Sequence, residues 1–501
     1  MIDVIVIGSG IGGLSCAALL ARYGFKVVVC ESHTIAGGAA HGFERNGFKF
    51  DSGPSLYSGM SYSPSPNPLR QVLDAINEEI TWLNYETWGC CLPEGTFDTE
   101  VGASQFCEVL QQLRGETAVA EWRRLQEIMT PLAKAAIALP PAAVRYDLGA
   151  VLSVGQFLPS MLQNAIGLSK LTGAFAPVMN SVITDPFIRN WLDLLCFLLS
   201  GLPADSTNAA EVAFMFADWY RPNVQLNYPA GGSGAIVDAL VRGLEKRGGK
   251  LKLNAHVEKV LVENQKAIGV RLRNGEELRS RYVVSNASIW DTLKLVDAFP
   301  KQFRTKRQAT PTCESFMHLH LGIDGKGLDS IACHHIVVND WNLGITAPQN
   351  VVLISIPSLL DPSLAPPGKH TLHVYTPGNE PYDLWEQCES YPQLKQQRAE
   401  IMWKALERVI PDIRSRTELT LVGTPLTHAR FLRRYRGTYG AAIRATDGLF
   451  PSAMTPISGL LCCGDSTFPG IGLPAVAASG MIAANTIAPV RKHLELLKLI
   501  Q

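Results

Sequence analysis

The sequence lacks an excess of charge of either sign. Its 501 residues include 45 basic and 45 acidic side chains, which gives a formal net charge of +0. A protein that binds nucleic acid needs clustered positive charge, so this class of partner is excluded. Charged residues make up 18% of the chain and hydrophobic residues 47%, so the chain can bury a large core. Its length indicates two packed domains or one elaborated domain.

The sequence also lacks cysteines at the spacing of a redox or zinc motif. Eleven cysteines occur, including adjacent pairs at 90–91 and 462–463, but no C-x-x-C is present. This pattern favours reduced thiols in a cytosol-like compartment and indicates neither a redox disulfide nor a zinc site. The pair at 462–463 falls in an apolar stretch, and we expect both thiols to be buried and unreactive.

No hydrophobic run is long enough to cross a bilayer. The most apolar window, residues 191–199, is short and contains Asp193, so no transmembrane helix is predicted. Met1 leads directly into an apolar strand, so we expect no signal or transit peptide and a cytoplasmic protein that is either of bacterial type or a mature form. Residues 132–171 are rich in Ala, Leu and Pro, and two interpretations stay open. They form either a patch on a membrane surface or ordinary buried helices.

The first turn of the chain has the pattern of a dinucleotide-binding unit. Residues 4–31 read as an apolar strand, a glycine-rich turn, a small-residue helix, a second strand and a terminal acid. Glycines in such a turn allow close approach of a pyrophosphate, which the helix N-terminus then binds. Glu31 follows Gly13 by 18 residues, near the roughly twenty expected of the acid that holds the ribose. The predicted cofactor-binding residues here are Gly8, Ser9, Gly10, Ile11, Gly12, Gly13, Glu31 and Ser32.

A pair of adjacent glycines, Gly37 and Gly38, follows Glu31 and distinguishes between two dinucleotide cofactors, NAD and a longer one. An NAD domain has no need of this pair, whereas a longer cofactor laid across the sheet requires a second close backbone approach. Together with an Asp-x-Gly segment at 51–53, the pattern resembles the FAD-binding segment of the flavoprotein amine oxidase and phytoene desaturase superfamily. The predicted FAD-binding residues in this part are Gly37, Gly38, Ala39, Ala40, Gly53, Pro54 and Ser55.

The resemblance explains why a similar turn recurs at 460–487, where a strand, a Gly-Asp corner and a Gly/Pro loop precede a helix. In the superfamily the chain returns at its C-terminus to close the cofactor site. The resemblance implies that Asp465 accepts hydrogen bonds from ribityl hydroxyls and that the helix near 473 faces the flavin. The residues assigned in this way are Val257, Asn286, Gly464, Asp465, Leu473, Pro474 and Ala475.

The expected fold is α/β, with a discontinuous Rossmann-type FAD-binding domain and an inserted α+β substrate domain. We assign residues 1–70, 216–290 and 425–501 to the first domain, and 71–215 and 291–424 to the second, membrane-associating domain. After a helix that ends near 247, alternating stretches at 250–262, 266–273 and 277–284 predict a three-stranded meander.

Several later stretches are more specific and resemble the carotenoid isomerase branch of the phytoene-desaturase-like flavoproteins. They include NYPAGGSGAIVDALVRGL from 227, CHHIVVNDW from 333, VGTPLTHARFLRRYRGTYG from 422 and CCGDSTFPGIG from 462. The resemblance spans nearly the whole chain and implies bound FAD, an apolar tunnel, a polyene (carotenoid) substrate and peripheral attachment to a membrane, such as a photosynthetic one. The chain departs from the branch at 52–54, at Ile471 and at Leu473-Pro474, all beside the expected flavin.

The resemblance therefore implies FAD-dependent cis–trans isomerisation of a poly-cis-lycopene-type carotenoid, which needs reduced flavin yet is redox-neutral. Desaturation or saturation of a carotenoid or retinoid, with a quinone-like electron carrier, stays open. A non-catalytic carotenoid-binding flavoprotein and an amine oxidase stay open as well. No catalytic side chain and no electron partner is assigned. We expect the histidines at 318, 320, 334, 335, 373 and 428 to be core or rim residues, and the arginines at 430–436 to be a solvated or headgroup-facing edge.

Overall fold

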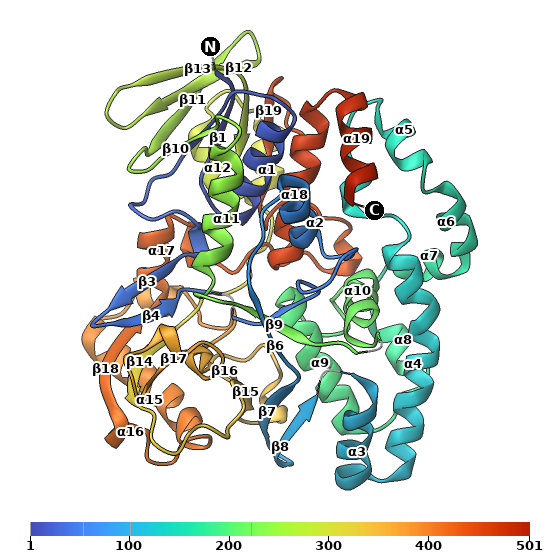
Figure 1. Ribbon diagram of the computed structural model, residues 1–501, viewed down its shortest axis with the longest axis vertical. Helices are drawn as coiled ribbons and strands as arrows, with labels where there is room; N and C mark the ends of the chain where they lie inside the picture. Colours follow the sequence, from blue (N-terminus) through green and yellow to red (C-terminus); the bar gives the residue numbers. More distant parts are fainter. Residues whose placement is uncertain (1, 54, 101, 222, 501) are drawn as a thin grey trace.

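The computed structural model describes residues 2–53, 55–100, 102–221 and 223–500 (Figure 1). Its first sheet has the strand order β10-β2-β1-β13-β12-β11, with β19 paired to β13. The pairs along β10, β2, β1, β13 and β19 are parallel, and β11, β12 and β13 pair antiparallel. The strands are β1 (Ile2–Ile7), β2 (Val27–Cys30), β10 (Lys250–Lys252), β11 (Val257–Glu263), β12 (Lys266–Leu272), β13 (Glu277–Ser285) and β19 (Leu460–Cys462).

Both faces of the parallel part of this sheet are covered, which explains the continuous apolar run in β1. Val4 and Val6 face a layer of helices, whereas Ile5 and Ile7 face the β11–β12 hairpin. The helices of the first layer are α1 (Ile11–Arg22), α2 (Pro68–Ile76), α11 (Gly234–Glu245), α18 (Leu473–Ile487) and α19 (Val490–Ile500).

A second sheet lies in the lower part of Figure 1 and has the order β18-β14-β17-β16-β15-β7-β8. All its pairs are antiparallel except β15 with β7. One face packs on α15 (Tyr391–Glu407) and α16 (Ile413–Arg416). The strands are β7 (Thr87–Leu92), β8 (Gly95–Glu100), β14 (His318–Asp324), β15 (His334–Val338), β16 (Val351–Ser355), β17 (Lys369–Tyr375) and β18 (Thr417–Gly423).

A block of helices forms the right-hand side of Figure 1. Its core is aromatic: Phe106 packs edge-on against Trp122 and stacks on Trp191. The helices are α3 (Ala103–Arg114), α4 (Glu116–Ile137), α5 (Ala150–Gly155), α6 (Leu158–Gln163), α7 (Ala165–Leu171), α8 (Ala176–Asn180), α9 (Pro186–Ser200) and α10 (Ala209–Trp219).

Shorter elements connect these three parts. Two small sheets consist of β3 (Gly42–Arg45) with β4 (Phe48–Asp51), and of β5 (Tyr57–Ser58), β9 (Leu226–Pro229) and β6 (Trp82–Tyr85). The other helices are α12 (Ile289–Leu295), α13 (Lys301–Gln308), α14 (Asp383–Glu386) and α17 (Pro425–Leu432). The 3-10 turns are η1 (Gly38–Ala40), η2 (Pro141–Ala143), η3 (Trp341–Leu343), η4 (Pro357–Leu359), η5 (Pro362–Leu364), η6 (Tyr435–Gly437) and η7 (Ala445–Asp447).

The fold class is confirmed, but one predicted strand is wrong. The stretch 250–262 is two strands, because Asn254 adopts a left-handed conformation with φ 54° and breaks the chain between them. β10 then pairs with β2 at the sheet edge, while β11 belongs to the hairpin. The domain boundaries stay a prediction. Among the described residues, no helix is both long and apolar enough to cross a membrane.

Candidate functional site

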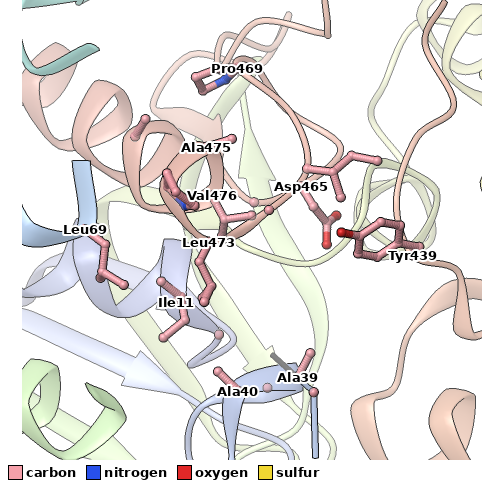
Figure 2. A pocket seen from close by; sticks show the side chains of 18 of the residues that line it. Ile11, Ala39, Ala40, Leu69, Tyr439, Asp465, Pro469, Leu473, Ala475 and Val476 are labelled. Atoms are coloured by element: carbon pink, nitrogen blue, oxygen red, sulfur yellow. The ribbon is translucent and has the colours of Figure 1, made fainter. Parts of the chain in front are cut away.

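A cavity of about 1080 Å³ runs between the first sheet, the second sheet and the helical block. Figure 2 shows part of its wall, where residues from the N-terminal turn and from the C-terminal helix surround one space. The following predicted site residues line it: Gly8, Gly10, Ile11, Glu31, Ser32, Gly37, Gly38, Ala39, Ala40, Gly53, Ser55, Val257, Asn286, Gly464, Asp465, Leu473, Pro474 and Ala475. Ser9, Gly12 and Gly13 are buried behind this wall, and Pro54 lies outside the described residues.

The glycines of the first turn are required by close backbone contacts. A Cβ on Gly13 would lie 2.2 Å from the carbonyl oxygen of Gly8, which itself has φ +91°. A Cβ on Gly10 would lie 2.8 Å from Nδ2 of Asn286, the residue that follows β13. Gly10 is also the N-cap of α1 and provides no side-chain cap, so the helix N-terminus stays open to the cavity.

Glu31 lies directly after β2 and connects two loops. Its Oε2 accepts hydrogen bonds from the backbone nitrogen of Ser9 at 2.8 Å and from its hydroxyl at 2.6 Å. Its Oε1 accepts from the backbone nitrogen of His33 at 2.8 Å and from the hydroxyl of Ser32 at 3.3 Å. A carboxylate has about four acceptor positions, so ribose hydroxyls would have to replace the two serine hydroxyls.

The second glycine pair lies directly against the first turn. Gly37 has φ +112° and donates its backbone N–H to the carbonyl of Ser9 at 3.1 Å. A Cβ on Gly38 would lie 3.1 Å from the Cα of Gly10. Gly53 in turn packs on this segment, since its Cβ would lie 2.2 Å from the carbonyl oxygen of Ala39. The three glycine segments therefore form one backbone-walled cradle.

The C-terminal turn completes this cradle. After β19, Gly464 has φ +106° and donates its N–H to the hydroxyl of Ser479 at 2.8 Å. The N-cap of α18 is Gly472, again without a side-chain cap, so a second helix N-terminus opens into the same cavity. Gly12 of α1 lies against α18, because its Cβ would be 3.1 Å from the carbonyl oxygen of Val476.

Asp465 has a partner that the sequence did not indicate. Its carboxylate forms an ion pair with the guanidinium of Arg434, and both side chains are half-buried. Arg434 also donates to the carbonyls of Thr438 and Tyr439, the latter at 2.8 Å. Figure 2 shows Asp465 and the ring of Tyr439 pointing toward one another in the cavity wall. The prediction of a solvated arginine edge is therefore wrong for Arg434, since its charge is compensated inside this wall.

The remainder of the cavity extends into the helical block and is mostly apolar. Three leucines of α9, aliphatic residues of α4 and α7, and two tryptophans line it. The residues concerned are Trp88, Ala135, Ala136, Leu139, Leu168, Leu171, Leu195, Leu198, Leu199, Phe214, Met215 and Trp219. An elongated apolar ligand fits this lining, because apolar walls with a few placed polar groups are typical of small-molecule sites.

Buried histidines lie at the border of the cavity. Nδ1 of His318 and Nε2 of His373 are 2.9 Å apart, and the rings of His320 and His373 stack 4.5 Å apart at 6°. The ligand nitrogens of these three histidines all lie within 4.8 Å of one another. Lone pairs of stacked rings run in parallel planes rather than toward one ion, and this favours the interpretation as core residues. That interpretation stays a prediction.

Burial keeps these rings neutral. It lowers the pKa of His320 to about 4 and that of His428 to about 3, and it holds the pKa of His318 and His373 well below the ordinary value. The thiol of Cys462 is buried too, and burial raises its pKa to about 12. The expectation that this cysteine is unreactive agrees with its position in β19.

The cradle fits a dinucleotide cofactor. Two helix N-termini without side-chain caps face one cavity, and glycines leave the backbone bare between them. Bare N–H groups at a helix N-terminus bind phosphate and stabilise negative charge. FAD offers a pyrophosphate for one N-terminus and an isoalloxazine ring for the other, so the residues present match its two ends.

Comparison with known proteins agrees with this assignment. The family described as flavin containing amine oxidoreductase matches residues 11–488. The chain is 34% identical to the chloroplastic prolycopene isomerase of Daucus carota, over 97% of this chain and 80% of that protein. It is 26% identical to the all-trans-retinol 13,14-reductase of Danio rerio, over 99% and 87% of the two chains. A putrescine oxidase bound to putrescine has the same fold, with a TM-score of 0.63 at 15% identity, covering 99% of both chains.

Proposed function

The chain belongs to the flavin-containing amine oxidoreductase family and binds FAD, and from this premise we propose that it is a carotenoid cis–trans isomerase of the poly-cis-lycopene type. The reaction would require reduced flavin and would be redox-neutral. The observation that carries the proposal is the continuity of one cavity, from the glycine cradle to the apolar chamber between α4, α9 and α10. A relative named prolycopene isomerase aligns along 97% of this chain.

In this proposal the protein positions the polyene and excludes water. FAD, when bound, supplies reversible donation of electron density to a conjugated double bond, which eases rotation about that bond. The open N-terminus of α18 would stabilise negative charge at the cradle, because the helix dipole is positive there. Leucines of α9 and the aromatic residues Trp88 and Phe214 would hold the chain of the polyene in an apolar environment.

A second candidate is saturation or desaturation of a carotenoid or retinoid, with electrons passing from or to a quinone-like carrier. It is favoured by the retinol reductase relative and by Ile471 and Leu473-Pro474, which depart from the isomerase branch and line the cavity. Both reactions use the same cradle, so they differ in outcome rather than in cofactor.

The test is anaerobic turnover of the purified protein with reduced FAD and poly-cis carotenes in liposomes. Chromatography and mass spectrometry are applied to the same samples. A changed retention time at unchanged mass, dependent on reduced flavin, is the expected result. A mass shift of two hydrogens would assign the second candidate instead. Bound FAD with no product from any polyene would contradict both.

We also propose that the protein rests on a membrane through α5 and α6. Leu148, Val151, Leu152 and Leu162 are 93%, 75%, 59% and 67% exposed, and these helices lie at the outer edge of Figure 1. Apolar side chains gathered on one surface indicate an interaction site. The neighbouring chain at 139–144 lines the cavity, so the patch lies beside an apolar route to the site.

The triple variant L148S/V151S/L152S should therefore lose membrane binding. Full burial of each aliphatic side chain is worth about 1.5–3 kcal/mol, so partition into vesicles should fall by at least about tenfold. Co-sedimentation with liposomes measures this change. The control is L343S in η3, because Leu343 is 62% exposed but lies in the connection between β15 and β16 of the second sheet. Equal sedimentation of both variants would contradict the assignment.

A further inference from the structure

Glu211 is a carboxyl group inside the apolar part of the cavity. It lies in the first turn of α10, three residues after the N-cap Asn208, and it lines the cavity wall. This spacing matches a capping box, in which the glutamate would bind the N-cap nitrogen. Asn208 does cap the helix through Ala210 at 2.9 Å. Within the described ranges, however, the Glu211 carboxyl forms neither that bond nor any other hydrogen bond or ion pair.

The surroundings of Glu211 offer it little compensation. Leu195, Leu198 and Leu199 of α9 line the same cavity, as do Phe214 and Met215, which follow Glu211 by three and four residues on α10. Burial in these surroundings raises the pKa of Glu211 to about 7, with no compensating partner. Both the neutral and the charged form are therefore accessible near neutral pH, and each has unused hydrogen-bonding capacity.

Asp218 on the same helix shows the contrast. It lies two turns after Glu211 and also lines the cavity. Its carboxylate accepts from the hydroxyl of Ser58, from Tyr62 at 3.1 Å and from Arg221 at 3.1 Å. The fold thus supplies partners to one acid of α10 and leaves the other facing the cavity. Glu211 is half-buried and lines the cavity, so a ligand that fills the cavity would bury its unpaired carboxyl, and a partner on that ligand is the simplest explanation.

We propose that Glu211 binds a hydroxyl group of the substrate, so that this site prefers a hydroxylated polyene over a pure hydrocarbon. The inference rests on the proposed function, because it takes the cavity to hold a polyene, and it changes the preferred substrate from the hydrocarbon poly-cis-lycopene to a hydroxylated polyene. A hydroxyl can donate to a carboxylate and accept from a carboxylic acid, so it pairs with both forms of Glu211. An ammonium would require the charged form in an apolar wall, where desolvation opposes an ion pair.

The experiment compares β-cryptoxanthin with β-carotene, which share one skeleton and differ by a hydroxyl. Binding to the FAD-loaded protein is followed by quenching of tryptophan fluorescence, since Trp88 and Trp219 line the cavity. The wild type should bind the hydroxylated ligand at least about tenfold more tightly, because a buried carboxyl left unpaired disfavours the hydrocarbon. E211L should abolish this ratio while hydrocarbon binding stays equal or improves. E211Q should retain most of the ratio, since an amide both donates and accepts.

The other outcomes distinguish failure of the inference from failure of the proposed function. Equal binding of the two ligands by the wild type overturns the inference and leaves the proposed function intact. An unchanged ratio in E211L overturns it as well. If E211L loses its FAD, E211Q decides, because it preserves shape, and loss of the ratio there contradicts a hydrogen-bonding role. If the FAD-loaded wild type binds neither ligand but binds poly-cis-lycopene, the inference fails and the proposed function stands; if it binds none of the three polyenes, both fail.

Discussion

Replacing Gly480 with valine is expected to release FAD and to destabilise the protein. Gly480 lies in α18 where this helix crosses α1, and a Cβ there would be 2.2 Å from the carbonyl oxygen of Gly12. Backbone atoms cannot move aside as a flexible side chain can, so the two helices would have to separate. The N-termini of both helices open into the cradle, and their separation would disrupt both ends of the cofactor site together.

We expect G480V to lose at least about 3 kcal/mol of stability, at the upper end of the range for overpacked cores, and to retain less than a tenth of its FAD. Flavin absorbance per protein after gel filtration and the thermal midpoint measure the two effects. The control is G155A in α5, where a Cβ would meet no atom within 4 Å. Alanine is the better helix former, so this variant should keep its FAD and its stability. Full FAD content in G480V would contradict the role of the close crossing.

The parts of the site that the sequence predicted are those built from local backbone geometry. Gly8 and Gly37 adopt positive φ in turns whose residues are adjacent in the chain, so their pattern is legible without a structure. The same holds for the small-residue helix at α18, although its crossing partner Gly12 is far away in sequence. The spacing of glycines along the sequence predicts each turn, whereas only the structure shows which turns lie against one another.

The residues that the sequence missed act through distant partners. Arg434 belongs to a run of arginines that reads as solvated, and only the folded chain brings it against Asp465. Glu211 matches a helix-capping pattern, and only the cavity shows that its carboxyl is unpaired. No pattern in the sequence could indicate that the Glu211 carboxyl lacks a partner. A glutamate three residues after an asparagine N-cap ordinarily predicts a hydrogen bond to the backbone of the N-cap residue.

The segment 132–171 contains both buried and exposed apolar residues, and the hydrophobic periodicity of the sequence did not distinguish them. Leu132 and Ala135 of α4 are buried, as one interpretation expected, whereas Leu148 and Val151 around α5 are exposed. Ala142 and Ala143 after α4 are buried as well, and the most exposed apolar residues of the segment lie around α5 and α6. The buried-helix interpretation is therefore incomplete and the membrane patch stays a proposal, because apolar composition alone does not say which side of a short helix meets the core.

Acidification from pH 7.5 to 5.5 is expected to destabilise the protein strongly through its buried histidines. His318, His320, His334 and His373 are buried and His428 lines the cavity, and desolvation lowers the pKa of each, to about 4 for His320 and about 3 for His334 and His428. In the unfolded chain a histidine has a pKa of about 6.5. Below that value the unfolded chain binds protons that the folded protein does not, so the stabilisation is complete above about pH 6.5 and is lost as the pH falls toward the folded values.

Each such histidine costs up to about 1.4 kcal/mol per pH unit below 6.5, so the five together should remove up to about 7 kcal/mol at pH 5.5. Urea unfolding of the FAD-loaded protein at pH 7.5, 6.5 and 5.5 measures this loss. H428F isolates one member, because phenylalanine preserves the ring contacts with Phe316 and His318 but cannot bind a proton. Its free energy of unfolding should fall less steeply with pH, by about 1.4 kcal/mol per unit. A slope equal to that of the wild type would mean that His428 is protonated in the folded protein, and the neutral histidine core would then be wrong at this position.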